Sequence, residues 1–468
     1  MIIARKEELE VLKEAYENEY SSFIAVYGRR RIGKTFLVKE AFDYNFTFSF
    51  SGIANEPKST QIKMFLKTIG KYGVEVDYKC NNWLDAFSYL EVLIEKSKDI
   101  KKVIFLDELS WMASSTKTSF ISALDFFWNS YASMRKDVLL IVSSSATSWL
   151  IDNVIHNKGG LYHRLTHTIE LKPFTLKECM EYSDKCNLHM NRKDILETYM
   201  VFGGIPYYWS LLKGDLSVAQ NVDRLIFSRN GELNKEFTYL YASLFKKPEG
   251  YINIVTSLGN KQSGLTREEI AKQAKTANNG DLSKKLTELE ECGFIREYRP
   301  LEKRKKGSMF QLIDQFTLFY FHFLCPPPTE ENYFENNYQS AKINSWKGRT
   351  FESVCLLHTN QMKRALGIEG VSTNVCSYSF RSKDKGHQID LLLQRRDGII
   401  NLCEMKYSSS KYEISKQEYE NYSSRIEDFI EENPSYSIHF TFVTPIGLEK
   451  NKYSNIVSKV ITLDDLFA

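Results

Sequence analysis

One eight-residue segment restricts the fold of this 468-residue chain more than any other feature. Residues 28–35 read GRRRIGKT and directly follow the apolar run FIAVY at 23–27. Such a run suits a strand that is buried on both faces of a parallel sheet. The helical pattern FLVKEAFDY comes next. Strand, glycine loop and helix in this order predict a phosphate-binding loop within an α/β domain that has right-handed crossovers.

The residue types in this loop suit the phosphates of ATP. Two glycines let the backbone curl so that its N–H groups face phosphate oxygens. We expect Lys34 to reach the β and γ phosphates and the Thr35 hydroxyl to ligate Mg²⁺. The alternative is a structural glycine turn. The predicted nucleotide-binding segment comprises Gly28, Arg29, Arg30, Arg31, Ile32, Gly33, Lys34 and Thr35.

A second apolar run, at 103–106, ends in Asp107 and Glu108. Carboxyl ends of parallel strands meet at one edge of a sheet, so these acids are expected beside the loop. Asp107 would then help to hold Mg²⁺, and Glu108 would polarise the attacking water. The alternative is a solvated acidic turn at the end of a strand.

A third apolar run, at 138–142, is followed by three serines. Of these, Ser144 and Ser145 are predicted to lie beside the γ-phosphate, where a polar side chain could sense it; an ordinary strand-to-helix cap is the alternative. Arg164 precedes a further short strand at 168–171. It is a candidate arginine finger, acting in cis or in trans, and a surface salt bridge is the competing interpretation.

Composition and charge bound the class of protein. Hydrophobic residues make up 43% and charged residues 26%, values typical of a globular protein rather than a disordered one. Lys and Arg exceed Asp and Glu by 62 − 59 = 3, so any basic surface must be local. Eight cysteines without a CxxC pair fit a reducing compartment, and no apolar stretch is long enough for a membrane helix. We therefore expect a cytoplasmic protein without a membrane partner.

Taken together, the first 325 residues resemble the AAA+-like, archaeal-type ATPases of the STAND class of P-loop NTPases. The resemblance implies an ATP- and Mg²⁺-dependent ATPase core at 1–174. The helical pattern that follows Pro173, with few strand signals, predicts a helical lid at 175–248. This chain has Ser144-Ser145 where the family usually has Gly-Ser, and His163 where it usually has Gly. The segments that carry the resemblance are IARKEEL (3–9), YGRRRIGKT (27–35), FLDE (105–108), LYHR (161–164), LKPF (171–174) and GGIP (203–206).

Residues 249–325 show the pattern of a winged helix. Three helical segments precede two short strands that flank the basic tip Lys303-Arg-Lys-Lys306, and Thr266 with Glu269 forms a capping-box pattern. A basic wing follows the phosphate backbone of DNA, and Lys284 and Lys285 lie on the third helix, where a recognition helix would enter a groove. A solvated hairpin tip is the alternative. Pro326-Pro-Pro328 opens a predicted linker at 326–345.

The last segment, 346–468, carries a second group of acids. Asp390 ends an apolar strand, and a return strand after the turn Asp397-Gly398 carries Glu404 and Lys406. Two carboxylates could hold a divalent cation, with Glu352 nearby, and Lys406 could act on a metal-bound water. A hairpin salt bridge is the alternative.

This arrangement resembles the core of PD-(D/E)XK nucleases, an α/β restriction-endonuclease-like fold, with Ile389 where the family usually has Pro. The whole chain is thus expected to be an ATPase that is coupled to DNA binding and to metal-dependent DNA cleavage. The alternative is a nucleotide-switched DNA-binding or signalling scaffold whose C-terminal domain does not cleave. Assembly into a homo-oligomer is left open.

Overall fold

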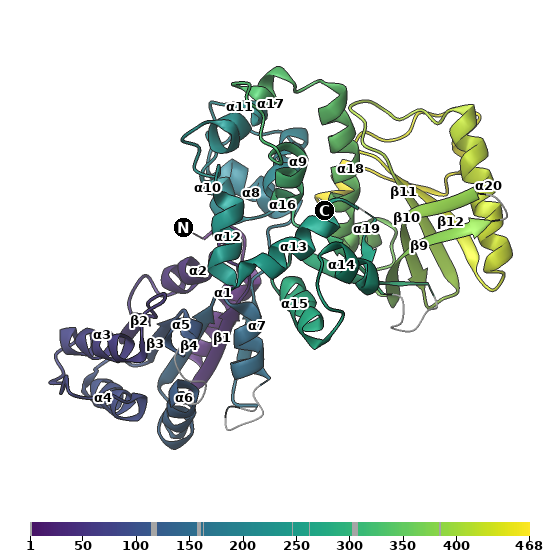
Figure 1. The fold of residues 1–468 in the computed structure, drawn as a ribbon. Helices are drawn as coiled ribbons and strands as arrows, with labels where there is room; N and C mark the ends of the chain where they lie inside the picture. The colour runs from purple at the N-terminus through teal and green to yellow at the C-terminus, as the bar shows by residue number, and fades with distance from the viewer. Residues whose placement is uncertain are drawn as a thin grey trace. The chain divides into compact units, whose positions relative to one another are not determined.

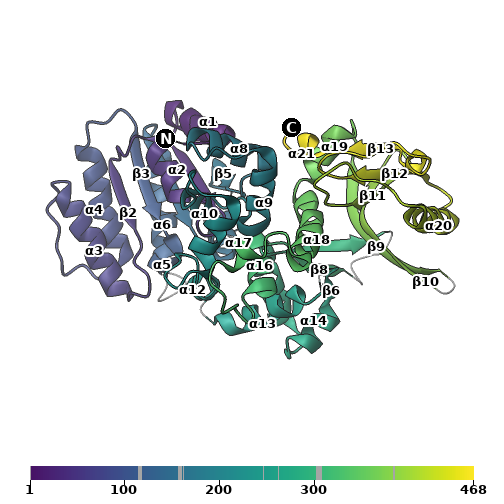
Figure 2. The same ribbon diagram turned by 90° about the horizontal axis from the view of Figure 1, so that it is seen from above.

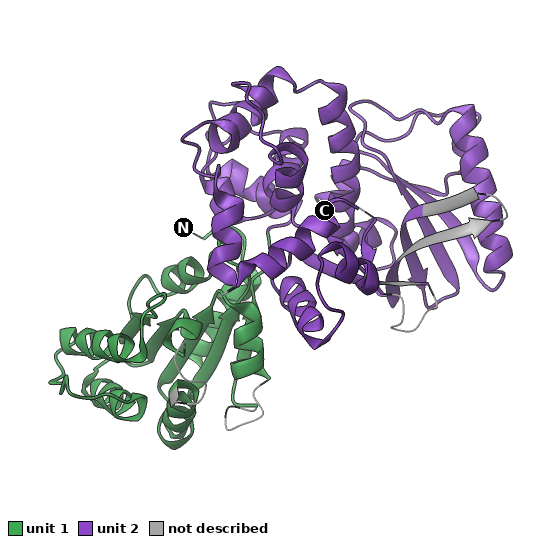
Figure 3. Cartoon of the chain, viewed as in Figure 1, with its two compact units in different colours: residues 1–173 green, residues 174–468 purple. Residues whose placement is uncertain are grey.

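The structure is a computed structural model in which the chain forms two compact units, residues 1–173 and 174–468 (Figure 3). It describes residues 2–113, 119–156, 161, 163–245, 247–261, 263–301, 308–382 and 385–468. Within these ranges, no helix combines the length and the apolar character that are needed to cross a bilayer.

Unit 1 is built on a five-stranded, fully parallel sheet in the order β2-β3-β4-β1-β5 (Figure 1). This confirms the α/β core with a P-loop type of sheet. The short strand β2 was not predicted, because its four residues FSFS alternate apolar and polar side chains and lack a long apolar run. The strands are β1 (Ser22–Tyr27), β2 (Phe48–Ser51), β3 (Lys102–Asp107), β4 (Val138–Ser144) and β5 (His167–Glu170).

Helices cover the sheet of unit 1. The predicted helices at 58–72, 82–97 and 118–134 correspond to α3, α4 and α6, although the third ends early and continues as a 3₁₀ turn. Their apolar residues pack with inward side chains of β1, β3 and β4 in one core. The helical elements are α1 (Lys6–Glu17), α2 (Lys34–Ala41), α3 (Lys58–Lys71), α4 (Trp83–Lys96), α5 (Leu109–Met112), α6 (Ser119–Ser130), η1 (Ala132–Met134), α7 (Thr147–Leu150) and η2 (Ile151–Ile155).

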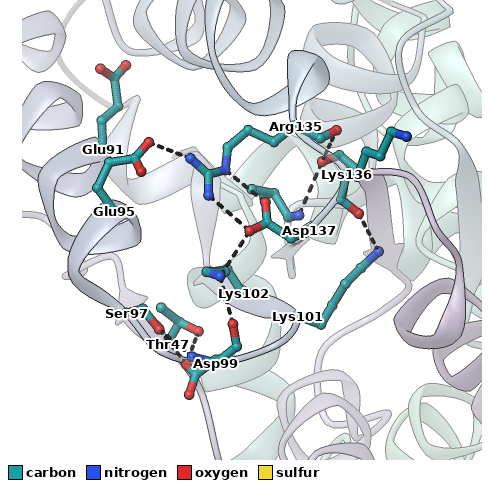
Figure 4. A network of polar contacts seen from close by, with 12 residues as sticks. Thr47, Glu91, Glu95, Ser97, Asp99, Lys101, Lys102, Arg135, Lys136 and Asp137 are labelled. Atoms are coloured by element: carbon teal, nitrogen blue, oxygen red, sulfur yellow. Dashed lines mark hydrogen bonds and ion pairs between the residues drawn. The ribbon is translucent and has the colours of Figure 1, made fainter.

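A polar network ties together the amino-terminal ends of β3 and β4 (Figure 4). Arg135 forms a bidentate pair with Asp137, whose carboxylate also lies 2.9 Å from the Lys102 ammonium. The buried Lys101 ammonium donates to three backbone carbonyls, those of residues 18, 20 and 136. These contacts hold the base of the sheet, at the end opposite to the predicted phosphate loop.

Unit 2 begins with a helical segment at the place of the predicted lid. Capping boxes at Thr175–Glu178 and Asn191–Asp194 start α8 and α9, which explains why these helices begin where they do. The elements are α8 (Leu176–Lys185), α9 (Arg192–Phe202), α10 (Pro206–Ser210), α11 (Val218–Val222), η3 (Asp223–Phe227) and α12 (Glu236–Leu244).

The next segment has the order of elements expected of a winged helix. The Thr266–Glu269 capping box is confirmed at the start of α14. Strand β8 pairs with β6 on one side and with β7 on the other, both antiparallel. The elements are α13 (Pro248–Gly259), β6 (Leu265–Thr266), α14 (Arg267–Gln273), α15 (Gly280–Glu291), β7 (Ile295–Pro300), β8 (Met309–Leu312) and α16 (Gln315–Phe323).

The C-terminal part contributes the larger share of a mixed eight-stranded sheet in the order β13-β12-β11-β10-β9-β7-β8-β6. Helix α20 packs its Tyr422 and Phe429 on this sheet beside β12 (Figure 2). The elements are α17 (Tyr333–Asn336), α18 (Ala341–Leu357), α19 (Thr359–Ala365), β9 (Thr373–Ser382), β10 (Lys385–Arg395), β11 (Ile399–Met405), α20 (Lys416–Glu432), β12 (Ser437–Val443), η4 (Ser454–Ile456), β13 (Lys459–Ile461) and α21 (Leu463–Leu466).

Two features of unit 2 differ from the expected chain of separate domains. Strand β7 of the winged-helix segment pairs in parallel with β9, so one sheet runs through both parts. The expected linker at 326–345 contains α17 and the start of α18, and its Phe334 is buried. The pairing of β7 with β9 depends on tertiary packing because the two strands are far apart in sequence. A local sequence pattern therefore cannot predict it.

Candidate nucleotide site and C-terminal acidic cluster

The loop at 28–33 joins β1 to α2, as the motif predicts. Gly28 has a φ of 139°, and a Cβ there would lie 2.4 Å from the Leu171 carbonyl oxygen, so only glycine fits. Gly33 has a φ of 93° at the start of α2, which also favours glycine. Arg29 and Ile32 are buried, whereas Arg30 and Arg31 are half-buried. The loop backbone is thus shaped by the two motif glycines.

Lys34 is the first residue of α2 and lies at the mouth of this loop. Its ammonium donates to the carbonyls of Gly28 at 2.8 Å and Arg29 at 3.0 Å, and the side chain is buried. A cation held over the loop at a helix N-terminus gives the site a positive potential that suits phosphate.

Asp107 ends β3 next to the loop. The Thr35 hydroxyl donates to its carboxylate at 2.9 Å, and the Ser143 hydroxyl of β4 donates to the other oxygen. A hydroxyl and a carboxylate side by side are hard oxygen donors of the kind that Mg²⁺ prefers. The two residues therefore fit the metal ion that the sequence predicts. Ser143 was not singled out; its place in the run of three serines after a buried strand is the signal that could have found it.

Glu108 follows Asp107 and is held by Ser145. The Ser145 backbone N–H donates to the Glu108 carboxylate at 3.0 Å, and the Ser145 hydroxyl donates to its second oxygen. Glu108 has a φ of 53°, an uncommon left-handed conformation for a residue with a side chain. Ser144 instead donates to Ser110, and Arg164 is exposed in the turn before β5. The structure thus brings Ser145 to the acid at the strand end.

Comparisons with known proteins show what the sequence of this chain is similar to. Residues 2–212 match the family described as "ATPase domain predominantly from Archaea". Over these residues the chain is therefore similar to that family of ATPase domains. The chain is also similar to an uncharacterized protein of Methanocaldococcus jannaschii, with 27% identity over 374 residues that cover 78% of this chain and 79% of the relative. An uncharacterized ATP-binding protein of the same organism is 48% identical over 40 residues, 8% of this chain and 68% of the relative.

Solved structures that are similar to this chain include the following three. The Walker-type ATPase of Pyrococcus abyssi has a TM-score of 0.49 and 17% identity, over 69% of this chain and 96% of that one. The ORC2 protein of Aeropyrum pernix has a TM-score of 0.44 and 14% identity, over 67% and 91%. A STAND protein with a tetratricopeptide repeat sensor from Pyrococcus horikoshii has a TM-score of 0.31 and 18% identity, over 79% of this chain and 52% of that one.

Outside the ATPase domain, the C-terminal sheet brings the predicted acids together. In the antiparallel pairing of β10 with β11, Leu391 faces Cys403, which places Asp390 opposite Glu404. The pairing of β10 with β9 has a register shift between residues 389 and 392, and the Asp390 carboxylate accepts the Met405 N–H at 3.1 Å. We call Glu352, Asp390, Glu404 and Lys406 the acidic cluster.

The charges of the acidic cluster affect one another. Burial raises the pKa of Glu352, and the Asp390 carboxylate raises it further. Burial also raises the pKa of Asp390, with the Glu404 carboxylate as the next cause. Although burial lowers the pKa of Lys406, the Glu404 carboxylate, 2.8 Å from its ammonium, keeps that pKa above the ordinary value. Glu352 of α18 thus interacts electrostatically with the three hairpin residues Asp390, Glu404 and Lys406.

Arg425 of α20 joins the acidic cluster and was missed by sequence reasoning. Its guanidinium donates to Glu404 at 2.6 Å, so Lys406 and Arg425 engage both oxygens of that buried carboxylate. Arg425 lies three residues after Tyr422 and four before Phe429, both buried. A charged residue on an apolar helix face was the available signal.

Among the described residues, no group of three or more His, Cys, Asp or Glu side chains is arranged to hold a metal ion. Two cations pair with the Glu404 carboxylate and partly neutralise it. The metal site expected at Glu352, Asp390 and Glu404 stays a prediction.

The predicted DNA-contact residues divide into two groups. The wing residues Lys303, Arg304, Lys305 and Lys306 lie outside the residues that the structure describes. On α15, Lys284 lies 3.8 Å from Glu288, and Lys285 pairs with Asp281. The two lysines therefore have acidic partners on their own helix.

Proposed function

We propose that residues 1–173 hydrolyse ATP in a Mg²⁺-dependent reaction. The observation that carries the proposal is the meeting of Thr35, Asp107 and Glu108 beside the Lys34 loop at the carboxyl edge of one parallel sheet. When bound, Mg²⁺ neutralises charge on the phosphates, and Thr35 and Asp107 would hold it.

Binding of the phosphates and activation of the attacking water are carried out by different residues of this chain. Lys34 and the loop N–H groups bind and orient the β and γ phosphates. Glu108 orients the water and accepts its proton as the oxygen attacks the γ-phosphorus, while the bond from that phosphorus to the bridging oxygen of ADP breaks. Ser145 keeps the Glu108 carboxylate in place by two hydrogen bonds.

The test compares two variants of the full-length protein in Mg²⁺-dependent phosphate release and nucleotide binding. Lys34→Ala should abolish hydrolysis and strongly weaken ATP binding, because it removes the cation from the β and γ phosphates. Glu108→Gln should lower turnover by about 10²-fold or more while ATP still binds, because only water activation is lost. Lys67→Ala and Glu10→Gln, at exposed positions of α3 and α1, serve as matched controls. Equal turnover of Glu108→Gln and wild type would remove Glu108 from the mechanism.

For the C-terminal domain, we propose a scaffold role without DNA cleavage. The observation that favours it is the double ion pairing of Glu404 by Lys406 and Arg425. Plasmid DNA should remain intact with Mg²⁺ or Mn²⁺, with or without ATP. Cleavage by the wild type that Asp390→Ala abolishes, and that exposed Glu420→Ala retains, would instead support a nuclease. ATP hydrolysis should be unchanged in both variants, because the two sites lie in different units.

A further inference from the structure

A buried glutamate in the helical segment connects it to the C-terminal sheet. Glu197 lies on α9, and its side chain is 2% exposed, which is rare for an ionisable residue. Its carboxylate accepts hydrogen bonds from the Lys347 ammonium at 2.9 Å, from the Tyr407 hydroxyl at 2.6 Å and from the Tyr338 hydroxyl. Lys193, one turn earlier on α9, lies 4.0 Å away.

The three donors come from segments that are far from α9 in sequence. Tyr338 precedes α18, Lys347 lies within α18, and Tyr407 follows the end of β11. The Lys347 ammonium also lies 3.8 Å from the centre of the Tyr338 ring, and Lys347 is itself buried. A buried charge is tolerated when it is paired and fully hydrogen-bonded, so these contacts depend on one another.

Two of the residues that donate to Glu197, Tyr407 and Lys347, lie close in sequence to members of the acidic cluster. Tyr407 is the neighbour of Lys406, whose ammonium pairs with Glu404. Helix α18 carries Lys347 and, five residues later, Glu352. The hydrogen bonds to Glu197 therefore fix the two elements on which most of the acidic cluster is built.

Other contacts join the same two parts of unit 2. The Leu176 N–H at the start of α8 donates to His358 Nε2 at 3.0 Å, and Gln315 of α16 donates to Ser353 of α18 at 2.8 Å. The β7–β9 pairing adds a backbone connection. Each of these contacts joins a residue that precedes the proline triplet at 326–328 to a residue that follows it.

We propose that Glu197 is a positioning residue that locks α9 to α18 and to the end of β11, so that the acidic cluster moves with the helical segment as one body. A rearrangement of α8 and α9 is then transmitted directly to Glu352, Glu404 and Lys406. A C-terminal domain on a free linker would not respond in this way. The proposal goes beyond ATP hydrolysis and holds whether or not the acidic cluster has an activity of its own.

Hydrogen–deuterium exchange of the full-length chain tests this link. Tyr407→Phe removes one hydroxyl and should speed amide exchange at least tenfold in α9 and α18, as well as at the end of β11. Tyr239→Phe, at a 60% exposed position of α12, is the matched control and should change nothing. Exchange in α3 and α4 should stay at the wild-type rate in both. A change confined to residues 405–409, or no change, would overturn the proposal.

Reactivity of Lys406 provides a readout that general loosening would not mimic. Glu197→Gln should raise the rate at which Lys406 is acetylated by acetic anhydride several-fold, relative to the exposed Lys411 in the same molecule. The double variant Glu197→Gln/Lys347→Met removes both buried charges and should return the rate towards that of the wild type. If Glu197→Gln does not fold, Tyr407→Phe carries the test and should raise the Lys406 rate in the same direction. An unchanged Lys406 rate in Glu197→Gln, or in Tyr407→Phe where Glu197→Gln does not fold, would contradict the positioning role.

Discussion

At the scale of single residues, Ser145 has two candidate roles: it senses the γ-phosphate, or it holds the Glu108 carboxylate in place. The sequence predicts a phosphate sensor, whereas the hydroxyl donates to the Glu108 carboxylate. Ser145→Ala should lower kcat for ATP about tenfold, the effect of one lost hydrogen bond of about 1.4 kcal/mol, and leave KM unchanged. Steady-state phosphate release measures both constants, with Ser144→Ala, whose contact is to Ser110, as the control. A raised KM with an unchanged kcat would indicate direct contact with the nucleotide.

At the scale of elements, His358 joins α8 to the end of α18. Its Nδ1 contacts the Val354 carbonyl at 2.8 Å and its Nε2 accepts the Leu176 N–H, so the neutral ring is required. Burial lowers the pKa of His358 to about 4. The ordinary value is about 6.5, so between these values the unfolded chain binds more protons and stability falls as pH falls.

The pH dependence of unfolding checks this element. Across pH 6.5 to 4, His358 should contribute a loss of about 3 kcal/mol in the free energy of unfolding. His358→Gln keeps an acceptor for the Leu176 N–H but does not titrate. Its stability should therefore be lower above pH 6.5 and change less across this range in denaturant titrations. Parallel curves for the two proteins would show that His358 does not titrate on unfolding.

At the scale of the whole molecule, DNA binding stays a prediction from the sequence, and that prediction assigns it to the charge of the wing. Replacing the four basic wing residues with Ala should weaken binding about equally for all sequences and reduce the salt slope by about 0.9 for each lost phosphate contact. Fluorescence anisotropy at several salt concentrations measures this slope. If the salt slope of the variant equals that of the wild type, the wing does not contact phosphates and serves only as a packing element. A matched control removes the same charge from α3 by replacing Lys58, Lys63, Lys67 and Lys71.

The nucleotide site could be predicted because its parts are local. An apolar run, two glycines and a helix lie within one short stretch, and Asp107 and Glu108 directly end a buried strand. Sequence order and the rules of parallel sheets then bring these parts to one edge. The hairpin itself was predictable for a similar reason, because Asp397-Gly398 marks a turn between two apolar strands. Its register was not, because a two-residue turn at 397–398 would place Asp390 opposite Met405 rather than opposite Glu404.

The long-range partners of the site residues, by contrast, were decided only by the tertiary structure. Arg425, Ser143 and Glu197 meet their partners across 21, 36 and 150 residues of sequence, respectively. The sequence patterns of β7 and β9 predict strands but do not predict that these two strands pair with each other. Periodicity and motifs report what a segment buries or exposes, whereas the identity of a contact across the fold depends on how whole elements pack. The sequence by itself thus predicted which residues meet at the candidate nucleotide site, whereas packing decided how unit 2 holds its acids.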